Sequence, residues 1–322
     1  MCVVYLLSPE TKMRFAGSRL IIEREGRRLS SLLLGETECV VQGRCATVTT
    51  PTVYALLSGG IPLFFVDGRG RVLGQMGTRR LSFERSCVQH DFFTDAAHGL
   101  ACARETVGRK IIAQRELLRS YAKSRHGARL TRAVSDLKIY RAKLSGAQTV
   151  DELRGFEGAA SRRYFEAFPD LLGEPWSWAG RSRRPPRDPV NALLSYGYAF
   201  LEREVRLAIL GAGLDARFGF LHANNGRKDS LVFDLMEPFR PAIIDRFVLR
   251  ALNRREFHIE EFETTEEQGC RLAPAARTRF IARYEEAMTR EAAGHASLRE
   301  SLRLAVRNFA AEMFCVAATR KF

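Results

Sequence analysis

The stretch "DPVNALLSYGYAFLEREVRLAILGAG", Asp188 to Gly213, is the clearest helical pattern in the chain and decides the class of its larger part. Apolar residues recur every three or four positions, which places them on one face of an α-helix. Asp188 can cap the first turn, Pro189 suits the first helical position, and Gly211 or Gly213 ends the helix. The predicted apolar stripe consists of Val190, Leu193, Leu194, Tyr198, Leu201, Val205 and Ile209.

Helical spacing extends over the sequence from about Cys87 onward, and residues 101–122 and 297–317 share it. One short break is expected at "HIEEFETTEEQGCRL", residues 258–272, where strand-like and turn residues replace the helical pattern. The second part of the chain is therefore predicted to be mainly helical.

Residues 1 to about 80 instead predict short strands bounded by turn signals such as "REGRR" and "DGRGR". One helix interrupts them at "TPTVYALLSGG", with Thr50 as the expected cap and Pro51 at the first position. The predicted class is α+β, with a small β-rich domain at 1–85, a larger helical domain at 86–322 and a linker between Met76 and Phe92. The predicted strands are "CVVYLL", "SRLIIERE", "SSLLLG", "ECVVQ" and "IPLFFVD".

The charge of the chain favours an acidic partner. Among 322 residues, 51 are Lys or Arg and 37 are Asp or Glu, giving a net charge of +14. Residues 109–143 hold eleven basic and two acidic side chains, so this segment alone carries +9, and "RSRRPPR" at 181–187 adds four arginines. A single charged run is usually a solvated surface, but two separate clusters favour a polyanion such as DNA.

The cysteines and the apolar segments exclude several classes of protein. Seven cysteines without a C-x-x-C spacing describe neither a disulfide framework nor a zinc site, and they suit reduced thiols. The start "MCVVYLLSPE" lacks a charged region before its short apolar run, and no stretch of about 18 apolar residues occurs. We therefore expect a cytoplasmic protein without a membrane span.

A second stretch, "GFLHANNGRKDSLVFDLMEPFRP" from Gly219 to Pro241, contains candidate metal ligands. His222 precedes an Asn-Gly turn, and Asp234 and Glu237 follow three residues apart. On a helix this spacing puts both carboxylates on one face, where they can share one cation. A further candidate is Glu157 in "DELRGFEGAASRRYFEAF", beside an apolar helical face on which small Ala160 and Ser161 leave room for a ligand; that face consists of Phe156, Ala160, Tyr164 and Phe168.

Two carboxylates and one imidazole suit Mg²⁺ or Mn²⁺ better than a closed zinc site. Each residue also has a structural explanation: His222 alone is more often a hydrogen-bonded histidine than a ligand, and Asp234 and Glu237 can cap a helix or pair with Arg240. Arg154 and Arg240 each lie three residues from a candidate acid. They either neutralise that acid or bind the phosphate that the metal activates.

Four blocks of the sequence carry a resemblance to a known family: "GIPLFFVDGRGRVLG", "GFEGAASRRYF", "DPVNALLSYGYAFLE" and "GLDARFGFLHANNGRKDSLVFDLMEPFRPAIIDR". In this order the chain resembles the CRISPR-associated adaptation integrases, the spacer-capturing proteins numbered one in the Cas series. The resemblance implies an antiviral-defence enzyme, a metal-dependent DNA endonuclease and integrase that inserts short duplex DNA at the boundary of a CRISPR repeat.

The resemblance also assigns residues. It places the metal ligands at Glu157, His222 and Glu237 and the supporting acid at Asp234, where "DLME" replaces the family's common D-x-x-D. Catalysis would involve the same four residues, with His222 either a ligand or a general acid. The block "GRKIIAQRELLRSY" has Ala113 where the family usually has asparagine. The residues expected to contact DNA are Arg109, Lys110, Arg115, Arg154, Arg162, Arg227 and Arg240.

The implied partners follow from the reaction. Insertion on both strands at opposite repeat ends requires at least two chains, and the β-rich domain is the expected dimerisation part. Double-stranded DNA, both prespacer and repeat, is the expected substrate, and a small second adaptation protein is expected to bridge two dimers. Two alternatives stay open: a non-catalytic architectural DNA-binding protein whose acids only form salt bridges, and a repair nuclease that acts on branched DNA.

Overall fold

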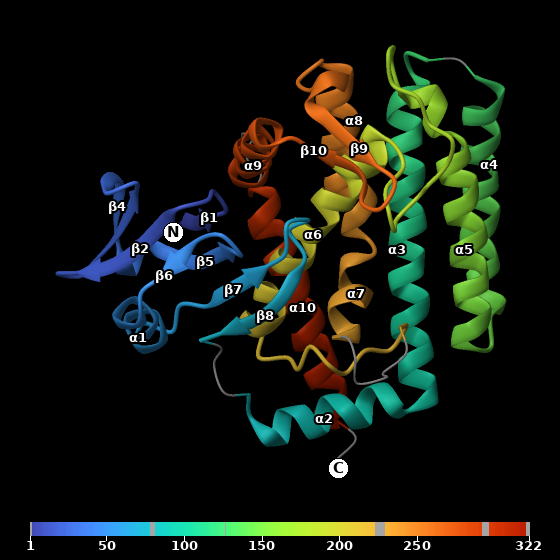
Figure 1. The fold of residues 1–322 in the computed structure, drawn as a ribbon. Coiled ribbons are helices and arrows are strands. Elements are labelled where there is room, and N and C mark those ends of the chain that lie inside the picture. Colours follow the sequence, from blue (N-terminus) through green and yellow to red (C-terminus); the bar gives the residue numbers. More distant parts are fainter. Residues whose placement is uncertain (1, 78–80, 126, 223–228, 292–295, 320–322) are drawn as a thin grey trace. The chain divides into compact units, whose positions relative to one another are not determined.

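The chain divides into two compact units, Met1–Arg80 and Leu81–Phe322. The structure, a computed structural model, describes residues 2–77, 81–125, 127–222, 229–291 and 296–319. The boundary lies five residues before the predicted one at 85, because a helix that begins at Phe83 is already part of the second unit. The fold class is the predicted α+β, with a β-rich unit followed by a larger helical one (Figure 1).

The N-terminal unit contains two four-stranded sheets with strand orders β1-β5-β7-β8 and β4-β3-β2-β6. Strands β1, β5 and β7 run parallel, while β8 closes the first sheet antiparallel to β7. Apolar side chains from both sheets and from α1 form one core, as their alternation along the strands dictates. The elements are β1 (Cys2–Leu6), β2 (Thr11–Ala16), β3 (Arg19–Arg24), β4 (Arg27–Leu33), β5 (Thr37–Gly43), β6 (Thr47–Val48), α1 (Thr50–Ser58), β7 (Leu63–Val66) and β8 (Val72–Met76).

The sequence did not predict three of these strands. In β2 only Thr11 and Met13 are buried, and the intervening charged residues mask the pattern. β6 has two residues and β8 has no fully buried side chain, so neither carries an apolar run. The cap of α1 is Thr49, one residue before the expected Thr50, and Pro51 lies in its first turn as predicted.

The second unit is built around α6 (Pro189–Gly211), the helix predicted from Asp188 onward. The carboxylate of Asp188 accepts the amide of Asn191 at 2.8 Å, which confirms it as the cap. Six of the seven residues of the predicted stripe are fully buried, and Tyr198 is half-buried. The opposite side, with Tyr196 and Phe200, is buried as well, so α6 is a core helix rather than a surface one.

The remaining elements surround α6, and α3, α4 and α5 lie side by side as one group (Figure 1). A hairpin of β9 and β10 forms at the predicted break. Among the described residues, no helix combines the length and the apolar character needed to cross a membrane. The elements are α2 (Phe83–Thr94), α3 (Ala96–Ala122), α4 (Ala128–Lys143), α5 (Val150–Glu166), α7 (Ser230–Met236), a π-helical segment (Arg240–Asp245), α8 (Arg246–Asn253), β9 (Phe262–Thr265), β10 (Gly269–Leu272), α9 (Pro274–Thr289) and α10 (Leu298–Thr319).

Gly197 lets α6 approach the π-helical segment closely. A Cβ atom built at this position would lie 2.6 Å from Cγ2 of Ile244 and 3.4 Å from the ring of Phe280. Both neighbours are buried, so neither can move aside easily. The π-helical segment begins three residues after Glu237, so this close packing also helps to hold the segment that carries Arg240 of the candidate site.

We expect Gly197→Ala to lower the free energy of unfolding by about 1–3 kcal/mol, because the added methyl overpacks a filled core. Urea unfolding measures the change. The matched control is Gly155→Ala in α5, where a Cβ meets no atom within 4 Å. That substitution should stabilise the protein by about 0.5–1 kcal/mol through helix propensity. Equal stability of the two variants would contradict the packing explanation.

Candidate active site

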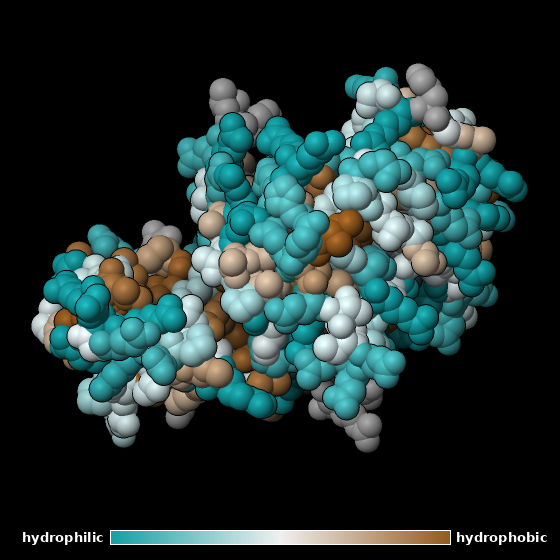
Figure 2. All heavy atoms as spheres, turned by 45° about the horizontal axis from the view of Figure 1, so that its top comes forward, coloured by the Kyte–Doolittle hydropathy of each residue, from teal (hydrophilic) through white to brown (hydrophobic). Residues whose placement is uncertain are grey.

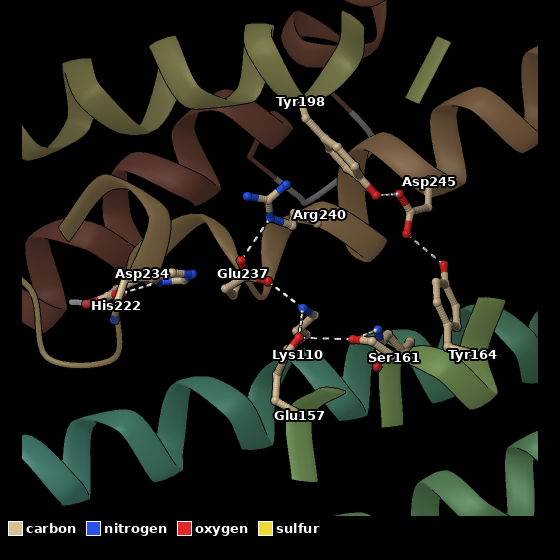
Figure 3. Close-up of polar contacts among 11 residues, drawn as sticks. Lys110, Glu157, Ser161, Tyr164, Tyr198, His222, Asp234, Glu237, Arg240 and Asp245 are labelled. Atoms are coloured by element: carbon tan, nitrogen blue, oxygen red, sulfur yellow. Dashed lines mark hydrogen bonds and ion pairs between the residues drawn. The ribbon is translucent and has the colours of Figure 1, made fainter. Parts of the chain in front are cut away.

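The candidate site lies where α3, α5 and the end of α7 meet, and a lysine forms its centre (Figure 3). Lys110 of α3 is buried, and its Nζ donates to Oε1 of Glu157 on α5. The same Nζ donates to Oε2 of Glu237 at 2.5 Å. Two carboxylates that are 80 residues apart in sequence therefore share one ammonium group.

Each glutamate carboxylate accepts a hydrogen bond from a second side chain besides Lys110. The hydroxyl of Ser161 donates to Oε1 of Glu157 at 3.0 Å, and Gln114, one turn after Lys110, donates to that hydroxyl at 3.4 Å. Arg240 donates from Nε to Oε1 of Glu237 at 3.1 Å. The carboxylate positions are thus set by side chains from three separate elements.

His222 is oriented by Asp234, which is fully buried in α7. Oδ1 of Asp234 lies 2.6 Å from Nδ1 of His222, and it also accepts the backbone amide of His222 at 2.9 Å. The other oxygen accepts the amides of Phe220 and Leu221 at 2.6 and 2.9 Å. Because the ionised carboxylate only accepts, the proton of a neutral imidazole sits on Nδ1, which leaves Nε2 as the acceptor.

The loop before His222 requires a glycine to wrap around Asp234. A Cβ atom at Gly219 would lie 2.5 Å from Oδ2 of Asp234 and 2.8 Å from Cβ of Ser230. The backbone amides therefore reach the carboxylate only because position 219 has no side chain.

The electrostatics favour the charged forms of the central groups. Burial would raise the pKa of Glu237, but Arg240 and Lys110 outweigh it and lower the pKa to about 2. Burial would likewise lower the pKa of Lys110, yet Glu237 and Glu157 raise it above its usual value. The ammonium and the carboxylate of Glu237 are therefore both ionised at neutral pH.

A further buried acid, Asp245, lies beyond the glutamates. Tyr198 and Tyr164 donate their hydroxyls to its two oxygens at 2.5 and 2.8 Å. Arg240 lies over the ring of Tyr198, 4.7 Å from its centroid, and so links this group to Glu237. Burial raises the pKa of Asp245 to about 6, although the two tyrosine hydroxyls partly oppose the shift.

A pocket of about 580 Å³ opens beside Glu157. Ser161 lines it, as the prediction of free space beside Glu157 requires, whereas Ala160 is fully buried. Aromatic and cationic side chains form the rest of its wall, including Phe165, Trp178, Arg162, Arg181 and Arg183.

The predicted ligands are not assembled around a common point. Among the residues that the structure describes, no group of three or more His, Cys, Asp and Glu side chains is placed to hold a metal ion. Glu157 and Glu237 meet at Lys110, while His222 turns to Asp234. Asp234 and Glu237 do not converge on one cation either, because Asp234 faces the loop and Glu237 faces α3.

Three of the residues predicted to contact DNA make contacts within the protein. Lys110, for which we predicted a phosphate contact, is instead buried between two acids. Arg154 contacts the carbonyl of Leu221 at 2.7 Å and Asp151 at 2.5 Å, not the predicted Glu157. The predicted pair of Arg240 with Glu237 is confirmed.

The other predicted contacts differ in exposure. Arg109 and Arg162 are exposed and Arg115 is partly exposed, while Arg227 lies outside the described residues. The sequence alone did not identify Gln114, Tyr164, Tyr198 or Asp245 as parts of the site. One signal was present: Lys110 and Gln114 interrupt the buried stripe of α3, which is otherwise formed by residues such as Ala103, Val107, Ile111 and Leu117.

Comparison with known proteins gives consistent relatives. Residues 4–286 match the family described as "CRISPR associated protein Cas1". The chain is 36% identical over 283 residues to a CRISPR-associated endonuclease Cas1 of Thermus thermophilus, which covers 88% of this chain and 85% of that protein. It is 35% identical over 302 residues to a Cas4/Cas1 exonuclease–endonuclease fusion of Geobacter sulfurreducens, covering 89% of this chain and 53% of the fusion. The chain thus spans about half the length of that fusion protein.

Solved structures share the fold. A chain of a Cas6-RT-Cas1–Cas2 complex superposes with a TM-score of 0.84 at 24% identity, over 97% of this chain and 35% of that one. A casposase bound to its integration product superposes with a TM-score of 0.83 at 21% identity, over 97% of this chain and 90% of the casposase. At these identities the likeness concerns the fold.

The raised pKa of Asp245 predicts a pH-dependent stability. Between about pH 4 and pH 6 the folded chain holds a proton on Asp245 that the unfolded chain has released, so stability falls as the pH rises through this window. Relative to Asp245→Asn, the wild type should lose up to about 3 kcal/mol between pH 4 and pH 7 and then level off. Urea unfolding followed by tryptophan fluorescence reports on this unit, because both tryptophans, Trp176 and Trp178, belong to it.

The exposed Asp91→Asn is the control for loss of a carboxylate. A difference between wild type and Asp245→Asn that stays constant from pH 4 to pH 7 would show that Asp245 is not protonated in the folded chain.

Proposed function

This chain belongs to the Cas1 family of CRISPR-associated proteins, and from that membership we propose that it is a DNA endonuclease and integrase of CRISPR adaptation. A terminal 3′-hydroxyl of a short DNA duplex attacks a phosphodiester at the repeat edge, the new phosphodiester forms, and the old 3′-oxygen leaves. With water as the attacking group the same displacement hydrolyses DNA. The endonuclease names of relatives that match most of this chain support the proposal.

The observation that carries the proposal is the meeting of Glu157 and Glu237 at one buried cation position. Glu237 is buried and Glu157 is partly buried, and two carboxylates this close repel each other unless one is protonated or a positive partner lies between them. Such a pair, next to an oriented imidazole, is the donor set that a hard divalent ion prefers.

The residues fit a divalent ion by their chemistry. Glu157, Glu237 and Nε2 of His222 would hold Mg²⁺ or Mn²⁺, and the nitrogen makes Mn²⁺ the better match. When bound, the ion supplies Lewis-acid stabilisation of the charge that develops on the phosphate and leaving oxygens. Asp234 fixes the tautomer and direction of His222, as carboxylates behind metal-ligating histidines do. His222 has a second candidate role as general acid, with Asp234 stabilising its protonated form.

DNA would lie across the cationic surfaces near the site. Arg109 on α3, Arg115 on the same helix and Arg162 on α5 offer side chains to phosphates. Arg162 lines the pocket beside Glu157, which brings a phosphate contact next to the proposed metal position. Arg240 keeps the role of binding the reacting phosphate when it is not paired with Glu237.

Partner chains follow from the reaction, because insertions on two strands need two sites at a fixed separation. We propose the β-rich unit as the dimerisation part. Among the described residues it holds six of the thirteen exposed large apolar side chains in about a quarter of the chain, and apolar atoms are visible on it in Figure 2. A small second adaptation protein would bridge two dimers; a similar solved structure is a complex that contains Cas1 and Cas2. The six side chains are Leu29, Leu33, Tyr54, Leu57, Leu73 and Met76.

One alternative has an observation in its favour. In an architectural DNA-binding protein the acids would only complete salt bridges, and Glu157 and Glu237 do form them with Lys110. That protein would bind DNA without Mg²⁺- or Mn²⁺-stimulated cleavage. A branched-DNA repair nuclease would hydrolyse but not join ends, even with a supercoiled repeat plasmid and the second adaptation protein present.

We expect Glu157→Gln, Glu237→Gln and His222→Ala each to reduce joining by more than about 100-fold, because several kcal/mol of transition-state stabilisation is lost. The assay is Mn²⁺-dependent joining of a short duplex to a supercoiled repeat plasmid. Affinity for the duplex, measured by anisotropy, should stay within about twofold, since phosphate contacts are made elsewhere.

Glu116→Gln, at an exposed glutamate of α3, is the matched control and should join at the wild-type rate. Circular dichroism checks that each variant is folded, because Glu237→Gln leaves buried cations without a partner charge. Wild-type joining by a folded variant would remove its residue from the site.

The basic segment generates a separate prediction about salt. We expect Arg119→Ala in α3 and Arg132→Ala in α4, both exposed, to weaken DNA binding and to reduce the slope of log K against log salt by about 1 for each phosphate that the variant no longer neutralises. Binding titrations at several salt concentrations give the slope. Arg250→Ala in α8, also exposed, is the control. Unchanged slopes in the first two variants would make the segment an ordinary solvated surface.

A further inference from the structure

Lys110 occupies a position that two carboxylates define from opposite sides. Its Nζ contacts Oε1 of Glu157 and Oε2 of Glu237, which belong to α5 and to the residue after α7. The lysine side chain is 9% exposed and that of Glu237 is 8% exposed, so water screens their contact little, whereas the side chain of Glu157 is 26% exposed. Any cation bound by both of these oxygens would have to lie where the ammonium group lies.

The charges around this position balance while the ammonium of Lys110 is the cation between the two acids. Lys110 and Arg240 carry two positive charges against those of Glu157 and Glu237. A divalent ion added without displacing the ammonium would bring a third and fourth positive charge into a buried space, next to Nζ. A divalent ion that replaces the ammonium leaves three positive charges against the two carboxylates, one fewer than when both cations are present.

Contacts of its own helix, α3, also keep Lys110 in this position. Lys110 and Gln114 project from one face of α3, and Gln114 reaches Glu157 through the hydroxyl of Ser161. Gln114 is 1% exposed, so its contact with Ser161 lies inside the packed interface between α3 and α5. The position of the ammonium is therefore set by the packing of α3, because Lys110 is not a flexible side chain on the surface.

We infer that Lys110 is a resident cation of the metal site: its ammonium holds Glu157 and Glu237 in place in the metal-free chain and must leave that position for a divalent ion to bind both. The inference rests on the metal site of the proposed function. Lys110 is then a positioning residue, and it lowers the apparent affinity for the ion, because binding occurs only in the fraction of molecules in which the ammonium has moved.

The test measures Mn²⁺ binding to the full chain by isothermal titration calorimetry, together with thermal unfolding in EDTA and in Mn²⁺. Lys110→Met should bind Mn²⁺ at least about tenfold more tightly than wild type. Its melting temperature should be lower than that of wild type in EDTA, because two buried acids lose their cation, and Mn²⁺ should raise it more than it raises that of wild type.

Two controls separate occupation of the position from loss of charge. Arg240→Met removes one positive charge from Glu237 but leaves Nζ between the acids. Lys138→Met removes the charge of an exposed lysine on α4. If Lys110→Met does not fold without metal, Lys110→Gln, which keeps amide donors for the carboxylates, replaces it.

The outcomes are distinct. Tighter Mn²⁺ binding by the Lys110 variants than by Arg240→Met and Lys138→Met supports the inference. Equal gains in the Lys110 variants and Arg240→Met overturn it, since charge alone then explains the effect. Wild-type Mn²⁺ affinity in the Lys110 variants overturns it while the metal site stands. Absence of Mn²⁺ binding from wild type and variants alike overturns the proposed metal site and the inference together.

Discussion

The contact on which the site depends is the buried ammonium of Lys110 between Glu157 and Glu237. Glu237 is buried and would not be stable there as an ion without an opposite charge, and Glu157, which is partly buried, shares the same cation. One lysine on α3 supplies that charge to both carboxylates. It thereby holds α5 and the end of α7 against α3, with Arg240 neutralising the second oxygen of Glu237.

Asp234 orders the part of the site around His222, as Lys110 orders the part around the two glutamates. Its carboxylate accepts three backbone amides and contacts the imidazole of His222, so this one buried acid orders the polar groups of the loop, while Phe220 packs into the apolar core. Gly219 is the sequence condition for that arrangement, because any side chain there would collide with Oδ2 of Asp234. Arg154 adds a bond to the carbonyl of Leu221 and so holds the residue directly before His222.

The sequence predicted what local patterns encode. Asp188, Pro189 and a repeating apolar spacing define α6, and the break near residue 262 appears as a hairpin. It failed where a residue's role depends on partners far along the chain. Lys110 belongs to a basic run, so charge counting placed it on the surface, whereas packing of α3 against α5 buries it. Spacing likewise put Asp234 and Glu237 on one face, but α7 ends at Met236 and the two acids turn to different partners. Tyr164, Tyr198 and Asp245 carry no local signal, because their contact joins three separate elements.

A salt bridge and a metal site are usually opposed explanations for buried acids, but the metal site proposed for this chain would use the same two carboxylates that the salt bridge holds. An ammonium group and a divalent ion make similar demands on a pair of carboxylates: burial, convergence and a nearby charge to compensate the surplus. The two explanations differ in the role of His222, which the ammonium does not contact. His222 contacts Asp234 through Nδ1 and takes no part in the lysine contacts, and its side chain is 46% exposed. A purely structural salt bridge gives no reason to build a buried carboxylate, three amides and a glycine around an exposed imidazole. The proposed metal site would give one, because its third ligand would be oriented before the ion arrives.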